Sequence, residues 1–384
     1  MDFATRAIHH GQQVDPQTGA VVPPIHLAST YKQHAAGQWR EFDYGRSGNP
    51  TRSLFQDVLA NLEGGVGCLA YASGMAAIHA VTMLLRPGDH IVAGSDLYGG
   101  AYRLLFKICQ PLGIETTLVN MTDTSQVSAA IKDNTRLIWG ETIGNPQLSI
   151  IDLPEIAEIA KQHGVLFGVD NTFGTPALIR PLEMGVDIVM HSATKYIGGH
   201  SDLLGGTLAV ADEDLLQRLY FVTNASGAVM DPTSAYNAAR GLKTLDLRVR
   251  AQSHAALEIA RWLHAHDSVQ DVMYPGLQQH PQHALADRLF DGGFGGMISF
   301  TVKGDLQQTS AVCGTTRLFQ LAVSLGAVES LIEQPATMSH ASYDAADRAK
   351  FGVVDSLIRL SIGLESPADL KSDLQLAFDA AGIG

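Results

Sequence analysis

The residues with the clearest chemical potential lie at the end of an apolar run, in the segment 187–195 (DIVMHSATK). Two hydroxyl groups, those of Ser192 and Thr194, stand beside Lys195, and a glycine-rich turn follows. A lysine amine attacks carbonyl carbons when its surroundings favour the neutral form, and hydroxyl groups can bind phosphate oxygens. The segment could therefore hold an anion and form a Schiff base at one spot.

The same spacing leaves two other interpretations open. Ser192-x-x-Lys195 matches the nucleophile motif of penicillin-recognising acyl enzymes, although the sequence lacks the Ser-Asp-Asn and Lys-Thr-Gly triplets that those enzymes use. Alternatively, Lys195 is a surface lysine after a buried strand, which is the usual position of a lysine. A second, independent signal is needed to choose between them.

A carboxylate ends the preceding apolar run, residues 164–171 (GVLFGVDN), a pattern that predicts a strand buried on both faces. A buried acid is costly without a cationic partner. Asp170 lies 25 residues before Lys195, about the length of one crossover helix and a second strand. Asp170 can therefore face the same site as Lys195, or it can cap the helix that follows.

A third signal is a turn from strand to helix through Ser73, Gly74 and Met75, ahead of a small-residue helix expected over 76–85. Small residues let backbone N–H groups approach a phosphate, and the helix N-terminus adds its dipole and unpaired donors. A tight connection without a ligand is the alternative.

One cofactor accounts for the three signals together. Pyridoxal phosphate (PLP) carries a phosphate, an aldehyde that a lysine can bind, and a ring nitrogen that a carboxylate keeps protonated while the ring takes up electrons. The sequence therefore predicts that Lys195 binds the aldehyde and later acts as the base, and that Asp170 meets the ring nitrogen. The predicted phosphate site consists of Ser73, Gly74, Met75, Ser192 and Thr194.

Stretches that match a known family run nearly the full length of the chain: 3–9, 44–46, 49–51, 62–65, 98–100, 169–173, 191–202 and 357–365. Through them the chain resembles the PLP-dependent enzymes of cysteine and methionine metabolism, a group that contains cystathionine γ-lyase, γ-synthase and β-lyase and methionine γ-lyase. The resemblance implies a fold-type I PLP enzyme of transsulfuration that acts on a small sulfur amino acid.

The same resemblance assigns roles in catalysis and substrate binding. Tyr98 would stack on the cofactor ring and exchange a proton with the departing sulfur; by itself it could be a core aromatic. Arg359 would bind the substrate's α-carboxylate, with Asn145 and Ser324 as helpers at the same end of the site. Independently, Arg359 stands in an apolar run and needs an anion if it is buried.

Residues 1–45 contain several turn formers and little periodicity, so an extended N-terminal arm is expected, either loose or docked on a neighbour. The resemblance implies that Tyr44 and Arg46 reach the phosphate of a neighbouring subunit's cofactor. The planar fork of arginine suits phosphate, whereas the residues alone would assign Arg46 to a solvated loop. The expected assembly is a homo-oligomer, a tetramer built as a dimer of dimers, with each site shared between two subunits.

Bulk properties exclude several classes of function. A formal charge of −13 argues against nucleic acid or an anionic membrane as a partner. The three cysteines are widely spaced, and the sequence has neither a hydrophobic signal core nor an apolar run of the ~20 residues that a membrane helix needs. A cytoplasmic location is therefore expected.

Two cofactor alternatives are rejected. The histidine pairs His264/His266 and His280/His283 lack a third ligand at convincing spacing, so no metal is expected. Gly65-x-Gly67 follows a probable helix and lacks the full dinucleotide fingerprint, so nicotinamide binding is not expected.

The elements that position these residues are those of an α/β protein. Apolar runs alternate with helical patterns and predict a mostly parallel, doubly wound sheet in a large PLP-binding domain, 46–245. The sequence pattern changes beyond residue 245, and a smaller α+β domain is expected over 246–384. Its expected elements are helices over 246–266 and 369–381 and a strand over 297–300. The strands expected for the large sheet are 69–72, 90–93, 115–119, 137–141, 165–170, 188–191 and 207–210.

The most detailed prediction concerns which sulfur amino acid is the substrate. Residues 199–202, Glu333 and Gly100 resemble cystathionine enzymes, whereas 227–229 and 341–343 resemble methionine γ-lyases. Residues 143–144 (IG) and Gly45 depart from the usual cystathionine pattern, and the former are similar to some homoserine sulfhydrylases. The predicted activity is a C–S lyase that cleaves L-cystathionine by γ-elimination, with β-elimination as a further activity. The alternatives are γ-replacement on O-acylhomoserine (cystathionine γ-synthase or O-acetylhomoserine sulfhydrylase) and methionine γ-lyase; outside the family, a Ser192 acyl enzyme or a cofactor-free binding protein.

Overall fold

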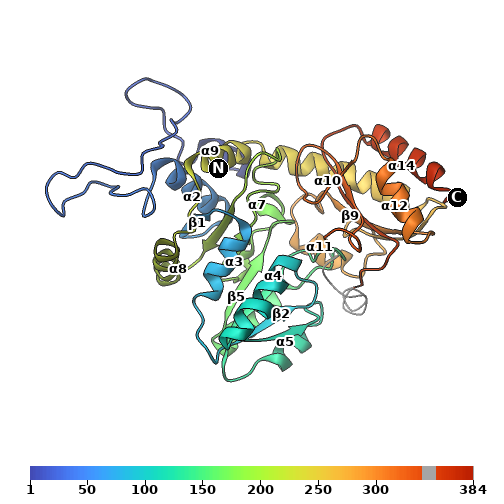
Figure 1. The fold of residues 1–384 in the computed structure, drawn as a ribbon, viewed down its shortest axis with the longest axis horizontal. Coiled ribbons are helices and arrows are strands. Elements are labelled where there is room, and N and C mark those ends of the chain that lie inside the picture. Colours follow the sequence, from blue (N-terminus) through green and yellow to red (C-terminus); the bar gives the residue numbers. More distant parts are fainter. Residues whose placement is uncertain (340–351, 384) are drawn as a thin grey trace.

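The computed structural model describes residues 1–339 and 352–383, and it contains two β-sheets flanked by helices (Figure 1). The large sheet has seven strands in the order β1-β7-β6-β5-β4-β2-β3. Its strands are β1 (Gly67–Tyr71), β2 (His90–Gly94), β3 (Glu115–Val119), β4 (Thr135–Glu141), β5 (Leu166–Asp170), β6 (Ile188–His191) and β7 (Gly206–Val210). The fold class predicted from the sequence, an α/β protein with a mostly parallel large sheet, is confirmed.

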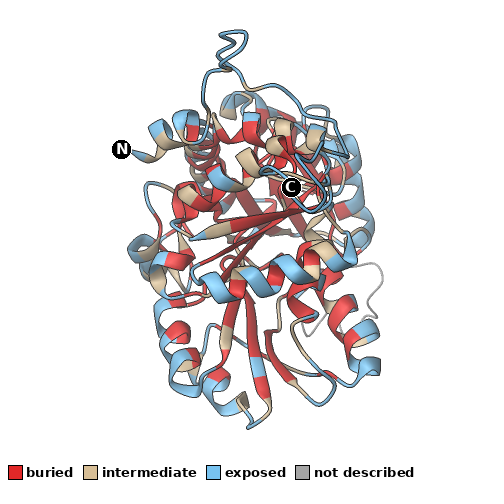
Figure 2. Cartoon of the chain, turned by 90° about the vertical axis from the view of Figure 1, so that its left-hand side faces the viewer, coloured by how far each residue is buried: buried red, intermediate tan, exposed pale blue. Residues whose placement is uncertain are grey.

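Only β7 runs against its neighbours, pairing antiparallel with both β1 and β6. The remaining neighbours pair parallel, which requires crossover helices between them. Alternate strand residues enter two different hydrophobic clusters: Val169 and Val189 in one, Ile188 and Met190 in the other. Both faces of the sheet are therefore covered, as Figure 2 shows by the red strands between helices.

The helices have local sequence signals at their ends. Asn49 caps α2 by accepting the N–H groups of Thr51 and Arg52, and Pro50 occupies the first helical position. The helices of the first 242 residues are α1 (Phe3–His9), α2 (Pro50–Glu63), α3 (Gly74–Thr82), α4 (Gly99–Leu104), α5 (Thr124–Ala130), α6 (Leu153–His163), α7 (Thr175–Leu178), α8 (Glu213–Ser226) and α9 (Pro232–Leu242). A π-helical segment covers Leu105–Cys109, and short 3₁₀ helices cover Gln110–Leu112 and Pro181–Met184.

A second, five-stranded sheet follows, in the order β10-β11-β12-β9-β8, and it has its own hydrophobic cluster. The expected long helix is α10 (Leu245–His264), and the closing helix is α14 (Pro367–Ala381). The strands are β8 (Val269–Met273), β9 (Met297–Val302), β10 (Gln320–Leu321), β11 (Leu331–Glu333) and β12 (Leu357–Ser361), and the other helices are α11 (His283–Leu289) and α12 (Leu306–Thr315). In Figure 1 this sheet and its helices lie to one side of the large sheet.

The N-terminal segment differs in part from a structureless arm. Residues 3–9 form α1, in which Ala7 is buried and Arg6 Nη1 donates to the carbonyl of Asn61 on α2 at 2.8 Å. A seven-residue helix gives too short a periodic pattern to be recognised in the sequence. The chain between α1 and α2 projects from the body as long loops (Figure 1), and most of its residues are exposed.

No helix in the described part of the chain is long and apolar enough to cross a membrane. Over the same residues, no three histidine, cysteine or acidic side chains gather as metal ligands would. The three cysteines are buried and unpaired.

Candidate active site

One cavity of ≈ 360 Å³ opens where the carboxyl ends of β1, β4, β5 and β6 meet residues of β11 and β12 in the second sheet. Ligands of open α/β sheets bind at this kind of crevice. All the residues predicted from the sequence line it except Tyr44 and Arg46. They are Ser73, Gly74, Met75, Tyr98, Asn145, Asp170, Ser192, Thr194, Lys195, Ser324, Glu333 and Arg359.

Lys195 follows β6, and its Nζ donates to the hydroxyl of Ser324 at 2.6 Å. Burial, followed by the positive charge of Arg359, lowers the pKa of Lys195 to about 8. Ser324 has a φ of 113°, a backbone conformation that residues with a side chain rarely adopt. The site therefore holds an amine that is partly neutral near physiological pH, as a nucleophile and base requires.

This lowered pKa predicts how the cofactor-free protein takes up PLP. Only the neutral amine can attack the aldehyde, so the uptake rate should rise about tenfold per pH unit below pH ~8 and level off above it. Stopped-flow absorbance between pH 6 and 10 measures this profile. A rate that keeps rising to pH 10 would show that the amine has the ordinary pKa of an exposed lysine.

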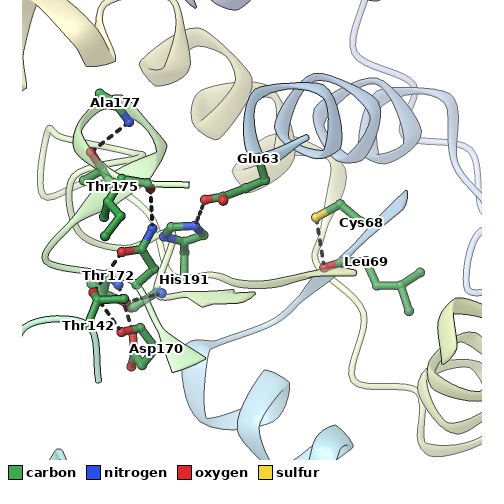
Figure 3. Close-up of polar contacts among 12 residues, drawn as sticks. Glu63, Cys68, Leu69, Thr142, Asp170, Thr172, Thr175, Ala177 and His191 are labelled. Carbon is green, nitrogen blue, oxygen red and sulfur yellow. Dashed lines mark hydrogen bonds and ion pairs between the residues drawn. The ribbon is translucent and has the colours of Figure 1, made fainter. Parts of the chain in front are cut away.

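Asp170 is the last residue of β5 and faces the same cavity. Its Oδ1 accepts the N–H of Thr172 at 2.9 Å, and the Thr172 hydroxyl accepts the N–H of Ser192 at 2.8 Å (Figure 3). The following helix α7 begins at Thr175, its N-cap position is Gly174, and no side chain caps it, so the capping alternative for Asp170 is wrong. Burial raises the pKa of this carboxyl, and the hydrogen bonds from Thr172 and the charges of His191 and Lys195 oppose that effect only in part.

The predicted phosphate segments pack tightly against each other. The Ser73 hydroxyl accepts the N–H of Ala76 and so caps α3. A Cβ on Gly74 would lie 2.8 Å from Met190 Cε and 3.2 Å from Ser192 Cβ, so any side chain here would force Met190 and Ser192 to shift. Thr194 exchanges hydrogen bonds with the backbone of Gly205, and these bonds fix the segment that carries Ser192 and Thr194.

These observations fit PLP. An amine of lowered pKa, a buried carboxyl of raised pKa and a helix N-terminus with adjacent hydroxyl groups share one cavity. They match the aldehyde, the ring nitrogen and the phosphate of the cofactor, in that order.

Arg359, on β12, is buried, and its guanidinium contacts several of the other residues that line the cavity. Its guanidinium donates to Asn145 Oδ1 at 2.8 Å and to the carbonyl of Ser324 at 3.1 Å, and it pairs with Glu333 Oε1 at 3.2 Å. The anion expected beside a buried Arg359 is therefore the carboxylate of Glu333 in the same chain. The Ser339 hydroxyl also donates to Glu333 Oε1, at 2.8 Å.

Sequence reasoning missed Glu141, a buried cavity residue at the end of β4. It pairs in register with Asp170 on β5, and its Oε1 accepts the backbone N–H of Tyr98 at 2.5 Å. Burial, then the charge of Asp170, raises the pKa of Glu141 well above its usual value. The acid at a strand end was the available signal, the same one that identified Asp170. We propose that the Glu141 carboxyl holds Tyr98 at the start of α4 by accepting its backbone N–H.

Substitutions of Glu141 test this role. Glutamine keeps an acceptor oxygen at this position, so Glu141→Gln should retain activity within about threefold, whereas Glu141→Ala leaves the Tyr98 N–H unpaired at a cost of about 1–3 kcal/mol. Steady-state kinetics of the two variants beside the parent enzyme decide this. Equal losses in both would mean that the negative charge of Glu141, rather than its acceptor oxygen, is used.

A second missed feature is a buried pair behind the cavity. Glu63, the last residue of α2, meets His191, the last residue of β6, with 2.5 Å between Oε1 and Nε2 (Figure 3). Both side chains are almost fully inaccessible. The charge of His191 lowers the pKa of Asp170, partly opposing the effect of burial. The pair also ties α2 to the strand that carries Ser192 and Lys195.

Tyr44 and Arg46 do not line the cavity in this single chain. Both are exposed, and the Arg46 guanidinium carbon lies 5.6 Å from the centroid of the Tyr44 ring. Their predicted role toward a neighbouring subunit's cofactor stays a prediction.

The departure of residues 143–144 from the usual cystathionine pattern has a local explanation at Gly144. A Cβ on Gly144 would collide with the Asp96 carboxylate and the Ser149 hydroxyl, which contact each other.

Known proteins resemble the chain over its whole length. A family model described as Cys/Met metabolism PLP-dependent enzyme matches residues 4–379. The chain is 47% identical over 375 residues to cystathionine beta-lyase of Coxiella burnetii, covering 97% of each protein. It is 47% identical over 379 residues to cystathionine gamma-lyase of Bacillus subtilis, covering 99% of this chain and 100% of the relative.

A solved structure of cystathionine gamma synthase from Xanthomonas oryzae pv. oryzae, in complex with aminoacrylate and cysteine, has a TM-score of 0.96 and 43% identity. The match covers 100% of this chain and 99% of that chain. These proteins carry three different activity names at similar identity.

Proposed function

Because the chain belongs to the Cys/Met metabolism family of PLP-dependent enzymes, we propose that it is a C–S lyase that cleaves L-cystathionine by γ-elimination to cysteine, 2-oxobutanoate and ammonia. β-Elimination of the same substrate is a second activity of the site. The single observation that carries the proposal is one cavity that holds Lys195, Asp170 and the Arg359–Glu333 pair together.

The residues of the chain have separate tasks in this reaction. PLP, when bound, supplies a sink for the negative charge that develops on the substrate. Asp170 would keep the ring nitrogen protonated, and the neutral Nζ of Lys195 would accept the proton from the substrate's α carbon, which is sufficient for β-elimination. For γ-elimination, a proton must also leave the β carbon before the γ thiolate departs. Tyr98, which also lines the cavity, supplies a proton to the departing sulfur. Its ring reaches solvent, since 45% of the residue is exposed.

Substrate recognition depends on the charged end of the cavity. The buried Arg359 presents a planar donor set that suits the α-carboxylate of an amino acid. Glu333 and the exposed Arg103 also line the cavity, so it offers both signs of charge to the distal amino-acid group of cystathionine. Methionine has no such group.

Gly100 supports the same substrate class. A Cβ at this position would lie 2.5 Å from Tyr98 Cε1 and 2.6 Å from Met75 Sδ, so any side chain would displace the Tyr98 ring. The methionine γ-lyase pattern, which has cysteine here, would need a different Tyr98 position. Of the two opposing sequence matches, 227–229 lies in the described structure and 341–343 lies outside the described residues.

Purified holoenzyme tests the proposal directly. Cystathionine alone should yield cysteine and 2-oxobutanoate, with pyruvate as the product of β-elimination, and methionine should be a poor substrate. O-acetylhomoserine with cysteine, and with sulfide, tests the γ-replacement alternative. Faster formation of cystathionine or homocysteine than of 2-oxobutanoate would replace the lyase with a γ-replacement enzyme.

Replacement of Arg359 by lysine tests its role. Lysine keeps the charge but not the planar fork, so Arg359→Lys should raise the KM for cystathionine on the order of 10²-fold, with a smaller change in kcat. Arg136→Lys, at a mostly exposed position, is the matched control. An unchanged KM would place the α-carboxylate elsewhere.

A further inference from the structure

Arg52 is a buried cation in the first turn of α2, outside the cavity described above. Only 5% of it is exposed. Its Nη2 donates to the carbonyls of Gly45 and Arg46, both at 2.9 Å, and its Nη1 donates to the carbonyl of Met230 at 3.4 Å. The guanidinium therefore reaches two separate segments of backbone at once.

The charge of Arg52 has no carboxylate partner among the described residues. Burial lowers its pKa, as expected for a desolvated cation. Burying a charge that is paired only with carbonyls lowers the stability of the folded state, and an uncharged side chain of similar volume would give a more stable fold. The arrangement is explained if the position of those carbonyls matters to function.

The first segment is the part of the arm that carries Tyr44 and Arg46. Its backbone is held close to the rest of the arm: the N–H of Gly45 donates to the carbonyl of Ser29 at 2.7 Å, and a Cβ on Gly45 would lie 3.2 Å from Ser29 Cα. The Tyr220 hydroxyl donates to the carbonyl of Ser47 at 3.2 Å. Arg52 thus fixes the backbone on both sides of an exposed arginine side chain.

The second segment leads to the predicted phosphate site. Met230 N–H donates to the carbonyl of Ala70 on β1 at 3.1 Å, and Val229 forms a bridge with Tyr71. β1 runs directly into Ser73 and Gly74. Through Arg52, the arm is therefore fastened to the strand that ends at the chain's own phosphate site.

We propose that Arg52 is a positioning residue that presets Tyr44 and Arg46 for the phosphate of the cofactor bound by an adjacent copy of this chain. The proposal rests on the proposed sharing of each site between two subunits. Arg52 itself touches neither cofactor; it acts through the backbone of residues 45–46. Loss of Arg52 should therefore weaken the partner's site and leave the pocket of its own chain intact.

Subunit mixing separates these two effects. Copies with Arg52→Met and copies with Lys195→Ala carry different tags, are co-expressed, and the mixed oligomers are purified through both tags. In the mixed oligomer, the pocket of the Arg52→Met copy receives an intact arm from the Lys195→Ala copy. We expect it to regain about half the activity per subunit pair of the parent enzyme, whereas each variant alone stays far below that value.

A second mixture distinguishes the two proposals. Arg46→Ala copies mixed with Lys195→Ala copies should also regain activity, because Arg46 would act in the partner. If this mixture fails, the shared site is wrong. If it succeeds and the Arg52→Met mixture does not, Arg52 acts on its own pocket and the present inference alone is overturned.

Two readouts do not depend on turnover. The dissociation constant for PLP of the Arg52→Met oligomer should rise on the order of ten- to a hundredfold, comparably to Arg46→Ala, because the charged group that holds the backbone of residues 45–46 is removed. Amide hydrogen exchange over residues 44–48 should become faster. An unchanged PLP affinity with slow exchange would contradict the proposal.

Matched controls cover simple destabilisation. Arg6 also donates to a carbonyl of α2, that of Asn61, which lies near the opposite end of this helix from Arg52, so Arg6→Met should lower thermal stability without changing PLP affinity. Arg52→Lys keeps the charge yet cannot reach both segments, and it should resemble Arg52→Met in PLP affinity. If Arg52→Met does not fold, Arg52→Lys carries the mixing experiment unchanged.

Discussion

Replacing Lys195 by alanine should reduce cystathionine cleavage on the order of 10⁴-fold or more, because one group serves both as the attachment point for PLP and as the base. The same change should abolish the visible absorption that PLP gains when it is bound covalently to a lysine. The position of Lys195 in the cavity, with its Nζ on the Ser324 hydroxyl and its pKa lowered to about 8, is the basis of this expectation.

Lys161→Ala is a suitable control, since Lys161 lies on the exposed side of α6. It should retain the parent's activity and spectrum. An unchanged spectrum in Lys195→Ala would move the covalent role to another residue. Added PLP should still bind to Lys195→Ala noncovalently, because the phosphate segments around Ser73 and Ser192 are untouched.

Replacing Asp170 by asparagine should lower kcat on the order of 10²–10³-fold, because a charge placed to stabilise the reacting cofactor is removed. Asparagine keeps an oxygen that can accept the Thr172 N–H, so the local backbone should be preserved. The loss should appear in kcat more than in KM, since the change acts on the transition state.

The stability of the cofactor-free Asp170→Asn protein should not fall with the activity, and it should equal or exceed that of the cofactor-free parent protein. Burial raises the pKa of Asp170, so folding favours the neutral form of this group, and the penalty for its charge grows as the pH rises above the unfolded value. The neutral asparagine avoids that penalty. Thermal melts of the cofactor-free proteins at neutral pH should show equal or higher stability for the variant. Lower stability together with lost activity would indicate that Asp170 is mainly structural.

Residues at the ends of buried strands could be predicted well from the sequence. Asp170, Lys195 and Ser73 each follow a short apolar run, and parallel strands bring such positions to one edge of the sheet. The strands that carry them match the expected ranges within a few residues. The mostly parallel sheet follows from the same alternation of strands and helices.

Contacts between distant segments could not be predicted. Glu63 and His191 are 128 positions apart, and neither carries a local motif that points to the other. Arg359 and Glu333 were each singled out in the sequence, but their pairing appears only when β12 and β11 are placed side by side. Glu141 shares its register position with Asp170, which depends on the order of strands in the sheet.

The arm illustrates a different limit. Its residues lack the periodicity that marks packed elements, yet α1 docks on α2 through one buried alanine and one arginine. The ordering of residues 44–48 depends on Arg52 and on Tyr220, which lie in separate helices. Such anchoring is set by tertiary contacts rather than by local sequence.

The most direct test of the central claim is to locate the residue that holds PLP. Borohydride reduction of the holoenzyme fixes the cofactor to its lysine, and peptide mass spectrometry then identifies the modified residue. The account predicts a single modification, on Lys195. Labelling of another lysine, or none at all in protein that retains PLP, would contradict it.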